Sequence, residues 1–372
     1  MRIGVITYWD SKDNYGQMLQ LYAMQGYLKK HGHQPFLIRY KADIPRRAEF
    51  RLRNIFNYVL KFPLYLKWFL NRRKLEQEKK IYAQTTNNEL RKFSVFLQDN
   101  VEMTPIVYTS ETIVANPPQA DAYICGSDQI WGSDWAYYLN FAPLESIKIA
   151  YAPSFGGAGN FNDDYKKELQ RLLARFDFVG IREQSGVELC KDLQRLDAVK
   201  VIDPTLLLGK EDYEKIRIPV NIKKPYLLLY LLGNPIQQST HDFYAFAKKN
   251  SLDVIYVASQ GKNDEFEKYP AQVGEFIDLV ANAEYVITNS FHCTVFSLLY
   301  HRKFLTIPLV DGYERMNCRV EDLLEESGLI TQLCCGDLDG ITVESLNFQN
   351  FDDYISKQQR ISENYLLSYL KC

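Results

Sequence analysis

The fold is indicated most clearly by the segment YVITNSFHCTVFSLL, which occupies residues 285–299. Its first four residues are apolar or β-branched and predict a buried strand, while residues 295–299 predict an apolar helix. A polar turn that begins at Asn289 separates the two. Strand, polar turn and helix in this order are typical of parallel α/β domains, whose ligands bind at the carboxyl ends of the strands. We therefore expect residues 289–292 to lie at a binding crevice.

The same unit recurs along the chain. A strand at residues 3–8, a polar loop and a helix at about 17–31 open the sequence. Further strands are predicted at residues 34–40, 121–125, 148–152, 178–181, 199–202, 226–232, 253–258 and 304–307. A charged break at 208–224, bracketed by prolines, divides the strands into two sets. We expect an N-terminal α/β domain over 1–207, a C-terminal α/β domain over 208–345, and a helix within 346–372 that packs back on the first domain.

Composition narrows the classes of function. The chain has 372 residues, more than one hydrophobic core usually holds, and its net charge of −2 gives no general attraction to nucleic acid. Of its seven cysteines only Cys334 and Cys335 are close in sequence, and an adjacent pair forms neither a redox motif nor a zinc site, so no metal is expected. The sequence has no signal peptide and no apolar run that could cross a bilayer, which predicts a cytoplasmic protein.

Residues 45–100 depart from the α/β pattern and predict a helical insertion. Within it, residues 50–74 mix aromatic side chains with Arg and Lys. Such a stretch either packs on the domain with its charges extended to solvent, or lies on an anionic membrane surface. Both interpretations stay open, and the second predicts a peripheral location at the inner face of the membrane.

His292 is the strongest candidate for a catalytic residue. It stands at the start of a predicted helix, where free N–H groups and the helix dipole favour an anion. Its imidazole could donate a proton near neutral pH, and Asn289 and Ser290 would line the same anion site. The alternative is that Asn289 or Ser290 only caps the helix, and that His292 bonds a buried backbone group.

Arg182 is a second candidate for binding an anion. It follows a predicted strand and precedes a helix that we expect Ser185 to cap. Its guanidinium could hold a carboxylate or phosphate by two parallel hydrogen bonds, which Lys could not do. The alternative is a surface ion pair with Glu183 or Glu188.

Two further turns supply polar groups. Asn14 and Gly16 could present an amide and backbone N–H groups to a ligand, although they could equally form a turn and a cap. Gly126, Ser127 and Asp128 offer a carboxylate that could bond a sugar hydroxyl, or could cap the next turn.

The remaining signals are weaker. Arg319, at the start of a helix predicted over 320–327, is a further candidate for binding an anion. The turn at 203–205 is interpreted as structural, because Pro204 fixes its backbone conformation. The sequence has no P-loop, no GxSxG elbow, no HExxH motif and no GxGxxG after a strand. The common nucleotide, hydrolase and metalloprotease signatures are therefore missing.

Six of the turns together resemble the polysaccharide pyruvyl transferase family. In the family's order they are NYGQMLQ at 14–20, GSDQIW at 126–131, YAPSFG at 151–156, REQSGV at 182–187, DPTLL at 203–207 and TNSFH at 288–292. The resemblance implies two Rossmann-like domains facing a cleft, a GT-B-like fold, in which residues 208–345 bind the donor.

The resemblance also implies an activity. Characterised members transfer the enolpyruvyl part of phosphoenolpyruvate to two hydroxyls of a sugar, which gives a pyruvate ketal and phosphate. By position, Arg182 would hold the donor's anionic groups, and His292 would bind phosphate or act as general acid. From its own chemistry, Asp128 could serve as the base that orients the acceptor hydroxyl. The acceptor would be a cell-surface or lipid-linked glycan in exopolysaccharide synthesis, and phosphoenolpyruvate would be a substrate, with no cofactor.

The sequence departs from the family pattern at Ser290, where members with ketal activity often have an arginine. Another cation must then compensate, and Arg319 and Arg315 are the candidates. Two rival functions stay open. One is a nucleotide-sugar-dependent glycosyltransferase of the GT-B type, and the other is a non-catalytic assembly factor docked to a membrane.

Overall fold

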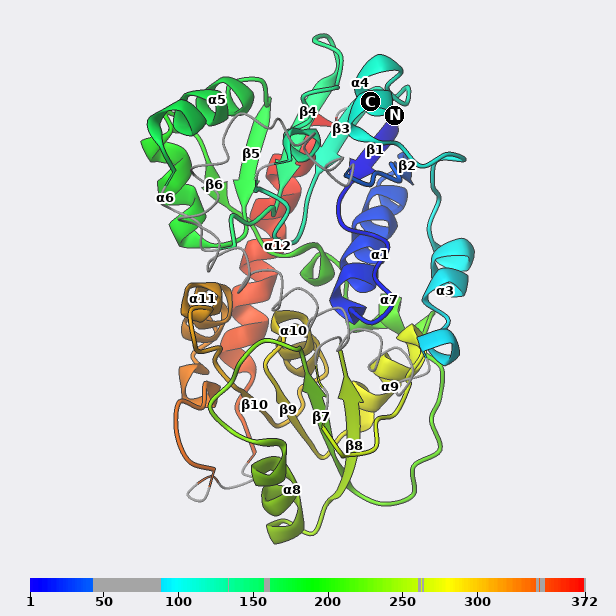
Figure 1. Ribbon diagram of the computed structural model, residues 1–372, viewed down its shortest axis with the longest axis vertical. Coiled ribbons are helices and arrows are strands. Elements are labelled where there is room, and N and C mark those ends of the chain that lie inside the picture. The colour runs from blue at the N-terminus through cyan, green and yellow to red at the C-terminus, as the bar shows by residue number, and fades with distance from the viewer. Residues whose placement is uncertain are drawn as a thin grey trace, which may run out of the picture.

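The computed structural model describes residues 1–42, 88–132, 134–156, 161–259, 262, 264–338, 341 and 345–370. This part of the chain forms two parallel sheets, one in each half of the sequence (Figure 1). The membrane-contact interpretation concerns residues 50–74, which lie outside these ranges. No helix within the ranges is long and apolar enough to cross a membrane.

The first sheet has the strand order β2-β1-β3-β4-β5-β6. Its strands are β1 (Arg2–Ile6), β2 (Gln34–Leu37), β3 (Ala122–Cys125), β4 (Ile147–Tyr151), β5 (Phe178–Ile181) and β6 (Val199–Lys200). β1 pairs with β2 on one side and with β3 on the other, so the direction of the strand order reverses at β1. In parallel sheets the ligand crevice lies at such a reversal, beyond the carboxyl ends of the strands.

Helices and single turns connect these strands. They are α1 (Tyr15–Lys30), η2 (Asn88–Arg91), α3 (Phe93–Asn100), α4 (Ser110–Ala115), η3 (Trp135–Tyr138), α5 (Asp163–Leu173), α6 (Gln184–Asp192) and η4 (Pro204–Leu206). α1 begins two residues before the predicted start, because the Asn14 side chain caps it by accepting a hydrogen bond from the Gln17 N–H at 3.3 Å. The residues of interest at 15 and 16 therefore belong to its first turn.

The second sheet has the strand order β10-β9-β7-β8. Its strands are β7 (Tyr226–Leu231), β8 (Asp253–Ala258), β9 (Tyr285–Thr288) and β10 (Phe304–Thr306). β7 pairs with both β8 and β9, so the order reverses at β7. The helical elements of this half are α7 (Lys210–Glu214), α8 (Thr240–Lys249), α9 (Val273–Asn282), α10 (Phe291–Leu299), η5 (Glu314–Asn317), α11 (Cys318–Glu326) and η6 (Ile330–Gln332).

The last helix, α12 (Gln349–Tyr369), spans both halves of the molecule (Figure 1). Near its start the Asp352 carboxylate lies 2.9 Å from His301 Nε2, in the second half. Near its end the ring of Tyr365 stacks on Phe178 of β5 with the ring centres 5.4 Å apart. α12 therefore ties the second sheet to the first along one side.

α1 joins the two halves at a second place. The Tyr15 ring stacks on Phe276 of α9 with the centres 4.3 Å apart, and its hydroxyl donates a hydrogen bond to the Ala271 carbonyl at 2.7 Å. One hydrophobic cluster contains buried side chains of both sheets, with α1 between them. The first turn of α1 is thus fixed against the C-terminal half by apolar burial, which is the main stabilising contribution to such an interface.

Candidate active site

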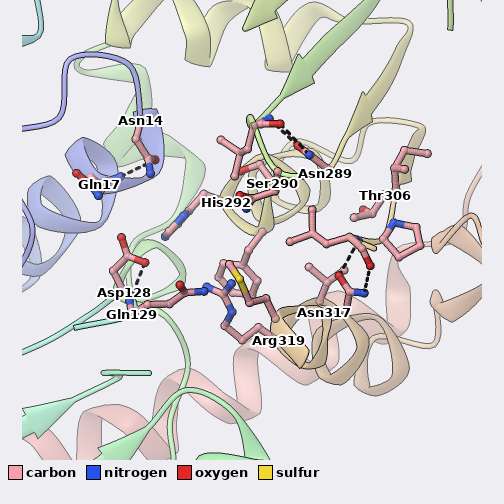
Figure 2. Close-up of a pocket in the computed structure, with 18 of the residues that line it drawn as sticks. Asn14, Gln17, Asp128, Gln129, Asn289, Ser290, His292, Thr306, Asn317 and Arg319 are labelled. Atoms are coloured by element: carbon pink, nitrogen blue, oxygen red, sulfur yellow. Dashed lines mark hydrogen bonds between the residues drawn. The ribbon is translucent and has the colours of Figure 1, made fainter. Parts of the chain in front are cut away.

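A cavity of about 270 Å³ lies between the two sheets (Figure 2). The loops that follow β1 and β3 supply Tyr8 and Asp128 to its wall, and those that follow β7, β9 and β10 supply Leu232, Asn289 and Ile307. The cavity therefore lies where the strand order reverses in both sheets, beyond the carboxyl ends of the strands. The predicted fold class, two Rossmann-like α/β domains facing a cleft in the GT-B manner, is confirmed.

The first turn of α10 forms one side of the cavity. Ser290 caps this helix by accepting a hydrogen bond from the Cys293 N–H at 3.4 Å. The Asn289 side chain accepts a hydrogen bond from the Leu232 N–H at 2.6 Å and donates one to the Leu232 carbonyl at 3.1 Å. Both side chains thus stabilise the local backbone, at the helix start and at Leu232, and also line the cavity. The Cys293 and Thr294 N–H groups are bonded to Ser290, so among the described residues the N–H groups of Phe291 and His292 are the ones left for an anion.

Arg319 of α11 adds a cation to the same wall (Figure 2). Among the residues that the structure describes, its guanidinium forms no ion pair, and its Nε is buried without a hydrogen-bond partner. Burial and the nearby Arg182 guanidinium lower the pKa of Arg319 to about 10. Arg319 is still a cation at neutral pH, but one whose charge is poorly compensated.

Arg182 lies at the carboxyl end of β5, behind the cavity wall. Its side chain is only 2% exposed, and it is not among the residues that line the cavity. Its Nη1 donates hydrogen bonds to Asp203 Oδ2 at 2.8 Å and to Ser127 Oγ at 3.3 Å. The guanidinium carbon lies 4.8 Å from the centre of the Phe291 ring, so this ring lies next to Arg182 as well as lining the cavity.

Two predictions about the surroundings of Arg182 are wrong. The alternative of a surface ion pair with Glu183 or Glu188 is not realised, because Arg182 is buried and its ion-pair partner is Asp203. Ser185 does not cap α6, because it lies inside the helix and Glu183 occupies the N-cap position. The chain turns into the helix earlier than the sequence suggested.

His292 links the cavity to the buried charges behind it. Its Nε2 is buried, has no hydrogen-bond partner among the described residues, and lies 3.6 Å from Asp203 Oδ2. Burial alone would raise the pKa of the Asp203 carboxyl, but the neighbouring His292 and Arg182 lower it below its ordinary value. Asp203 is therefore a carboxylate at neutral pH, placed between an imidazole and a guanidinium.

Gly16 allows His292 to occupy this position. A Cβ atom on Gly16 would lie 2.1 Å from Nδ1 of His292, a distance that atoms in proteins do not adopt. The first turn of α1 therefore packs directly against the imidazole, and only glycine leaves room for it.

The N-terminal wall of the cavity carries hydrogen-bonding groups. Asp128 follows β3 in a left-handed conformation, with φ of 74°, and its Oδ1 accepts a hydrogen bond from the Gln129 N–H at 2.8 Å. Gly126 precedes it at φ of 150°, and a Cβ there would lie 1.7 Å from the Tyr151 carbonyl oxygen. The close approach of β4 thus requires glycine at position 126, and two residues later Asp128 lines the cavity (Figure 2).

The structure separates the predicted site residues into two layers. Those that line the cavity are Asn14, Asp128, Asn289, Ser290, His292 and Arg319. Those that lie behind it are Gly16, Gly126, Ser127 and Arg182. Arg315 is exposed on η5 and does not line the cavity.

Sequence reasoning missed Asp203, which it assigned to a structural turn. One signal could have found it. Asp203 follows the strand next to the one that Arg182 follows, and the carboxyl ends of neighbouring parallel strands meet at one edge of a sheet. It also missed Tyr8, Gln17, Gln129, Asn234 and Asn317, all of which line the cavity.

Comparison with known proteins decides the family. The model of the polysaccharide pyruvyl transferase family matches residues 14–309. The chain belongs to this family. It is accordingly a transferase, and the resemblance drawn from its turns is confirmed. The match covers the cavity loops from Asn14 to Leu309 but ends before α11, so Arg319 lies outside it.

Similar backbones occur among solved structures, all at low sequence identity. A putative UDP-N-acetylglucosamine 2-epimerase from Listeria monocytogenes is 9% identical, with a TM-score of 0.47 over 91% of each chain. The UDP-GlcNAc 2-epimerase from Methanocaldococcus jannaschii is 11% identical, with a TM-score of 0.47 over 99% of this chain and 100% of that one. The glycotransferase of kitacinnamycin is 11% identical, with a TM-score of 0.38 over 99% of this chain and 95% of that one. No protein of curated function matches the sequence.

Proposed function

We propose that this member of the family transfers the enolpyruvyl group of phosphoenolpyruvate to two hydroxyls of a glycan, with release of phosphate. The observation that carries the proposal is the Arg319 guanidinium, which lies in the cavity wall without an ion pair among the described residues. A partly buried cation without a counter-ion favours an anionic ligand. Phosphoenolpyruvate carries both a phosphate and a carboxylate, and the start of α10 offers N–H groups to one of them.

The donor would lie against the C-terminal wall. Arg319 binds one anionic group, the first turn of α10 binds the other, and His292 stands between them and the N-terminal domain (Figure 2). Arg182 does not touch the donor in this arrangement. It acts from behind the wall, through Asp203.

The acceptor would lie against the N-terminal wall. Asp128, Gln129, Asn14 and Gln17 face the cavity there with carboxylate and amide groups, which are the usual partners of sugar hydroxyls. Asp128 is the only carboxylate in this wall among the residues described, so it is the candidate for orienting or deprotonating the attacking hydroxyl.

The reaction balances with these groups. A proton adds to the methylene carbon of phosphoenolpyruvate and produces an oxocarbenium-like centre at the adjacent carbon. The first acceptor hydroxyl attacks this carbon, the bond to the phosphate oxygen breaks, and the second hydroxyl closes the ketal. The two hydroxyls lose two protons, of which one replaces the proton delivered to the methylene group and the other leaves with phosphate. In this proposal His292 delivers the first proton and Asp128 accepts one from a hydroxyl, and both side chains line the cavity.

Phosphate release from phosphoenolpyruvate in the presence of candidate glycans tests the proposal, with the ketal identified by mass spectrometry. We expect His292→Ala and Arg319→Ala to lower turnover by about 100-fold or more, as loss of a catalytic acid or of a transition-state cation does. Arg315→Ala is the matched control, since it removes an exposed arginine outside the cavity. Equal activity of the Arg319→Ala and Arg315→Ala proteins would refute the donor site.

One observation favours a second candidate, a glycosyltransferase that uses a nucleotide sugar. The cavity continues from the anion site along apolar side chains, namely Ile307, Pro308, Leu309 and Leu333. Phosphoenolpyruvate has only a methylene group to place there, whereas a nucleoside has a planar ring. Thermal shift separates the two, because a ligand that binds only the native state raises the melting temperature. Stabilisation by UDP together with no response to phosphoenolpyruvate would replace the first proposal by the second.

A further inference from the structure

Asp203 is the most completely bonded charged group near the cavity. Its Oδ1 accepts hydrogen bonds from the Thr205 N–H at 3.0 Å and the Thr205 hydroxyl at 2.7 Å. Its Oδ2 accepts hydrogen bonds from the Ser127 hydroxyl and Arg182 Nη1, both at 2.8 Å. The carboxylate thus accepts these four hydrogen bonds, and its Oδ2 also lies 3.6 Å from His292 Nε2. A carboxylate held in this way is pre-organised to fix a neighbouring side chain.

The two nitrogens of His292 have different surroundings. Nε2 is buried and lies 3.6 Å from Asp203 Oδ2, with no hydrogen-bond partner in the part of the chain that the structure describes. Nδ1 lies on the side of Gly16, at the first turn of α1. Figure 2 shows the ring directed from α10 into the space between Asn14 and Asp128. Since a carboxylate accepts hydrogen bonds and does not donate them, it favours a proton on the nitrogen that faces it.

We propose that Asp203, held by Arg182, positions His292 so that its Nε2 keeps a proton toward Asp203 and its Nδ1 serves the substrate. Asp203 is a positioning residue in this arrangement, since it does not line the cavity. The inference rests on the proposed role of His292 and extends it by naming the reacting nitrogen. It also assigns a role to Arg182, because the Arg182 guanidinium fixes the Asp203 carboxylate, which in turn orients the His292 imidazole.

Several charged groups lie behind and along this part of the wall. Asp203 precedes η4, Arg182 and Glu183 follow β5, Asp128 follows β3, and Arg319 comes from α11. Among the carboxylates of the described residues, Asp203 is the one that lies within 4 Å of a His292 nitrogen.

Nitrogen-15 NMR of histidine-labelled protein tests the assignment without any assay of turnover. The chain has five histidines, and the signal that disappears in His292→Gln identifies the one in question. We expect wild-type His292 to carry its proton on Nε2 when the ring is neutral, and inorganic phosphate to shift the Nδ1 signal. A neutral ring with its proton on Nδ1 in the wild type would overturn the proposal, whatever the donor of the enzyme proves to be.

Asp203→Asn tests the role of the carboxylate. We expect the titration of His292 to move to lower pH and the alkaline limb of the pH–rate profile to move with it. We also expect kcat to fall about 10- to 100-fold, as for loss of a group that orients a catalytic one. An unchanged titration in a folded Asp203→Asn protein would refute the role. If that protein does not fold, Ser127→Ala removes one donor from the same oxygen and leaves the carboxylate charged. We then expect kcat to fall by less than in Asp203→Asn, because the carboxylate is held less firmly, and no fall would refute the role.

Asp212→Asn is the matched control. Asp212 is also a buried aspartate in ion pairs, with Lys30 and Lys215, but it does not line the cavity. Its loss should lower stability while leaving the titration of His292 and the pH–rate profile where they are. An equal shift in both variants would show that the effect comes from general destabilisation and not from Asp203. If phosphoenolpyruvate gives no turnover but the nitrogen assignment holds, the proposed donor fails and the positioning of His292 stands.

Discussion

Replacement of Gly16 by alanine probes the packing of His292 more directly than replacement of the histidine itself. The new Cβ would lie 2.1 Å from Nδ1 of His292, whereas ordinary contacts begin at 3.4 Å. One of the two groups must therefore move by about 1.3 Å. Gly16 is fixed because the neighbouring Tyr15 stacks on Phe276 and bonds the Ala271 carbonyl. We expect the imidazole to move and to lose its place against Asp203.

The expected effect on activity is larger than the effect on stability. Overpacking of this kind costs about 1–3 kcal/mol of folding free energy. A displacement of about 1 Å at a catalytic group lowers turnover about 100-fold. The assay is phosphate release from phosphoenolpyruvate, combined with urea unfolding of the same preparation.

Gly26→Ala provides the matched control on the same helix. Its Cβ would lie 3.3 Å from the end of the flexible Leu208 side chain, a contact that a small shift relieves. Alanine also favours a helix interior by about 0.5–1 kcal/mol over glycine. Gly26→Ala should therefore keep both its stability and its activity. A Gly16→Ala protein that folds and turns over like the wild type would show that His292 does not need its observed position.

Three further outcomes are expected. Asn289→Ala leaves the N–H and the carbonyl of Leu232 without the side chain that bonds both. The free energy of unfolding, measured by urea titration, should therefore fall by about 1–3 kcal/mol. An unchanged free energy would show that these two hydrogen bonds do not stabilise the fold. Asp203→Asn should cost about 3–5 kcal/mol at pH 7 because it breaks a buried pair. Since folding lowers the pKa of Asp203, this stability is present above the unfolded value of about 3.9 and is lost as pH falls, so thermal melts of variant and wild type should converge below pH 4. For residues 50–74, liposome flotation should show binding to anionic vesicles that charge reversal of the segment abolishes; equal flotation of both proteins would reject membrane contact.

The regular parts of the fold were predictable from local pattern. The strands at 178–181, 253–258 and 285–288 have the predicted bounds, because each is a short apolar run that ends in a polar turn. The strand predicted at 199–202 is only two residues long. β6 lies at the edge of its sheet and pairs only with β5, so little holds its remaining residues in the ladder.

The site was predictable as a set of turns but not as an arrangement. Arg182 was correctly expected to follow a strand, yet the sequence could not show that its partner is Asp203, since the alternatives at Glu183 and Glu188 are closer along the chain. Gly16 was named as a possible backbone donor, and its contact with His292 depends on the packing of α1 against α10. Distances between residues so far apart in sequence are set by tertiary packing, which periodicity does not encode.

The departure at Ser290 from the family pattern has a structural counterpart in Arg319. Ser290 caps α10 with its hydroxyl oxygen, which an arginine side chain could not do because it has no acceptor. The proposed anion site at the start of α10 must then take its cation from another element. Arg319 enters the cavity from α11, beyond the part of the chain that the family shares, and has no ion pair among the residues described. Ser290 thus caps the helix, and Arg319 supplies the cation. In the proposed donor site, the start of α10 supplies N–H groups and Arg319 supplies the charge.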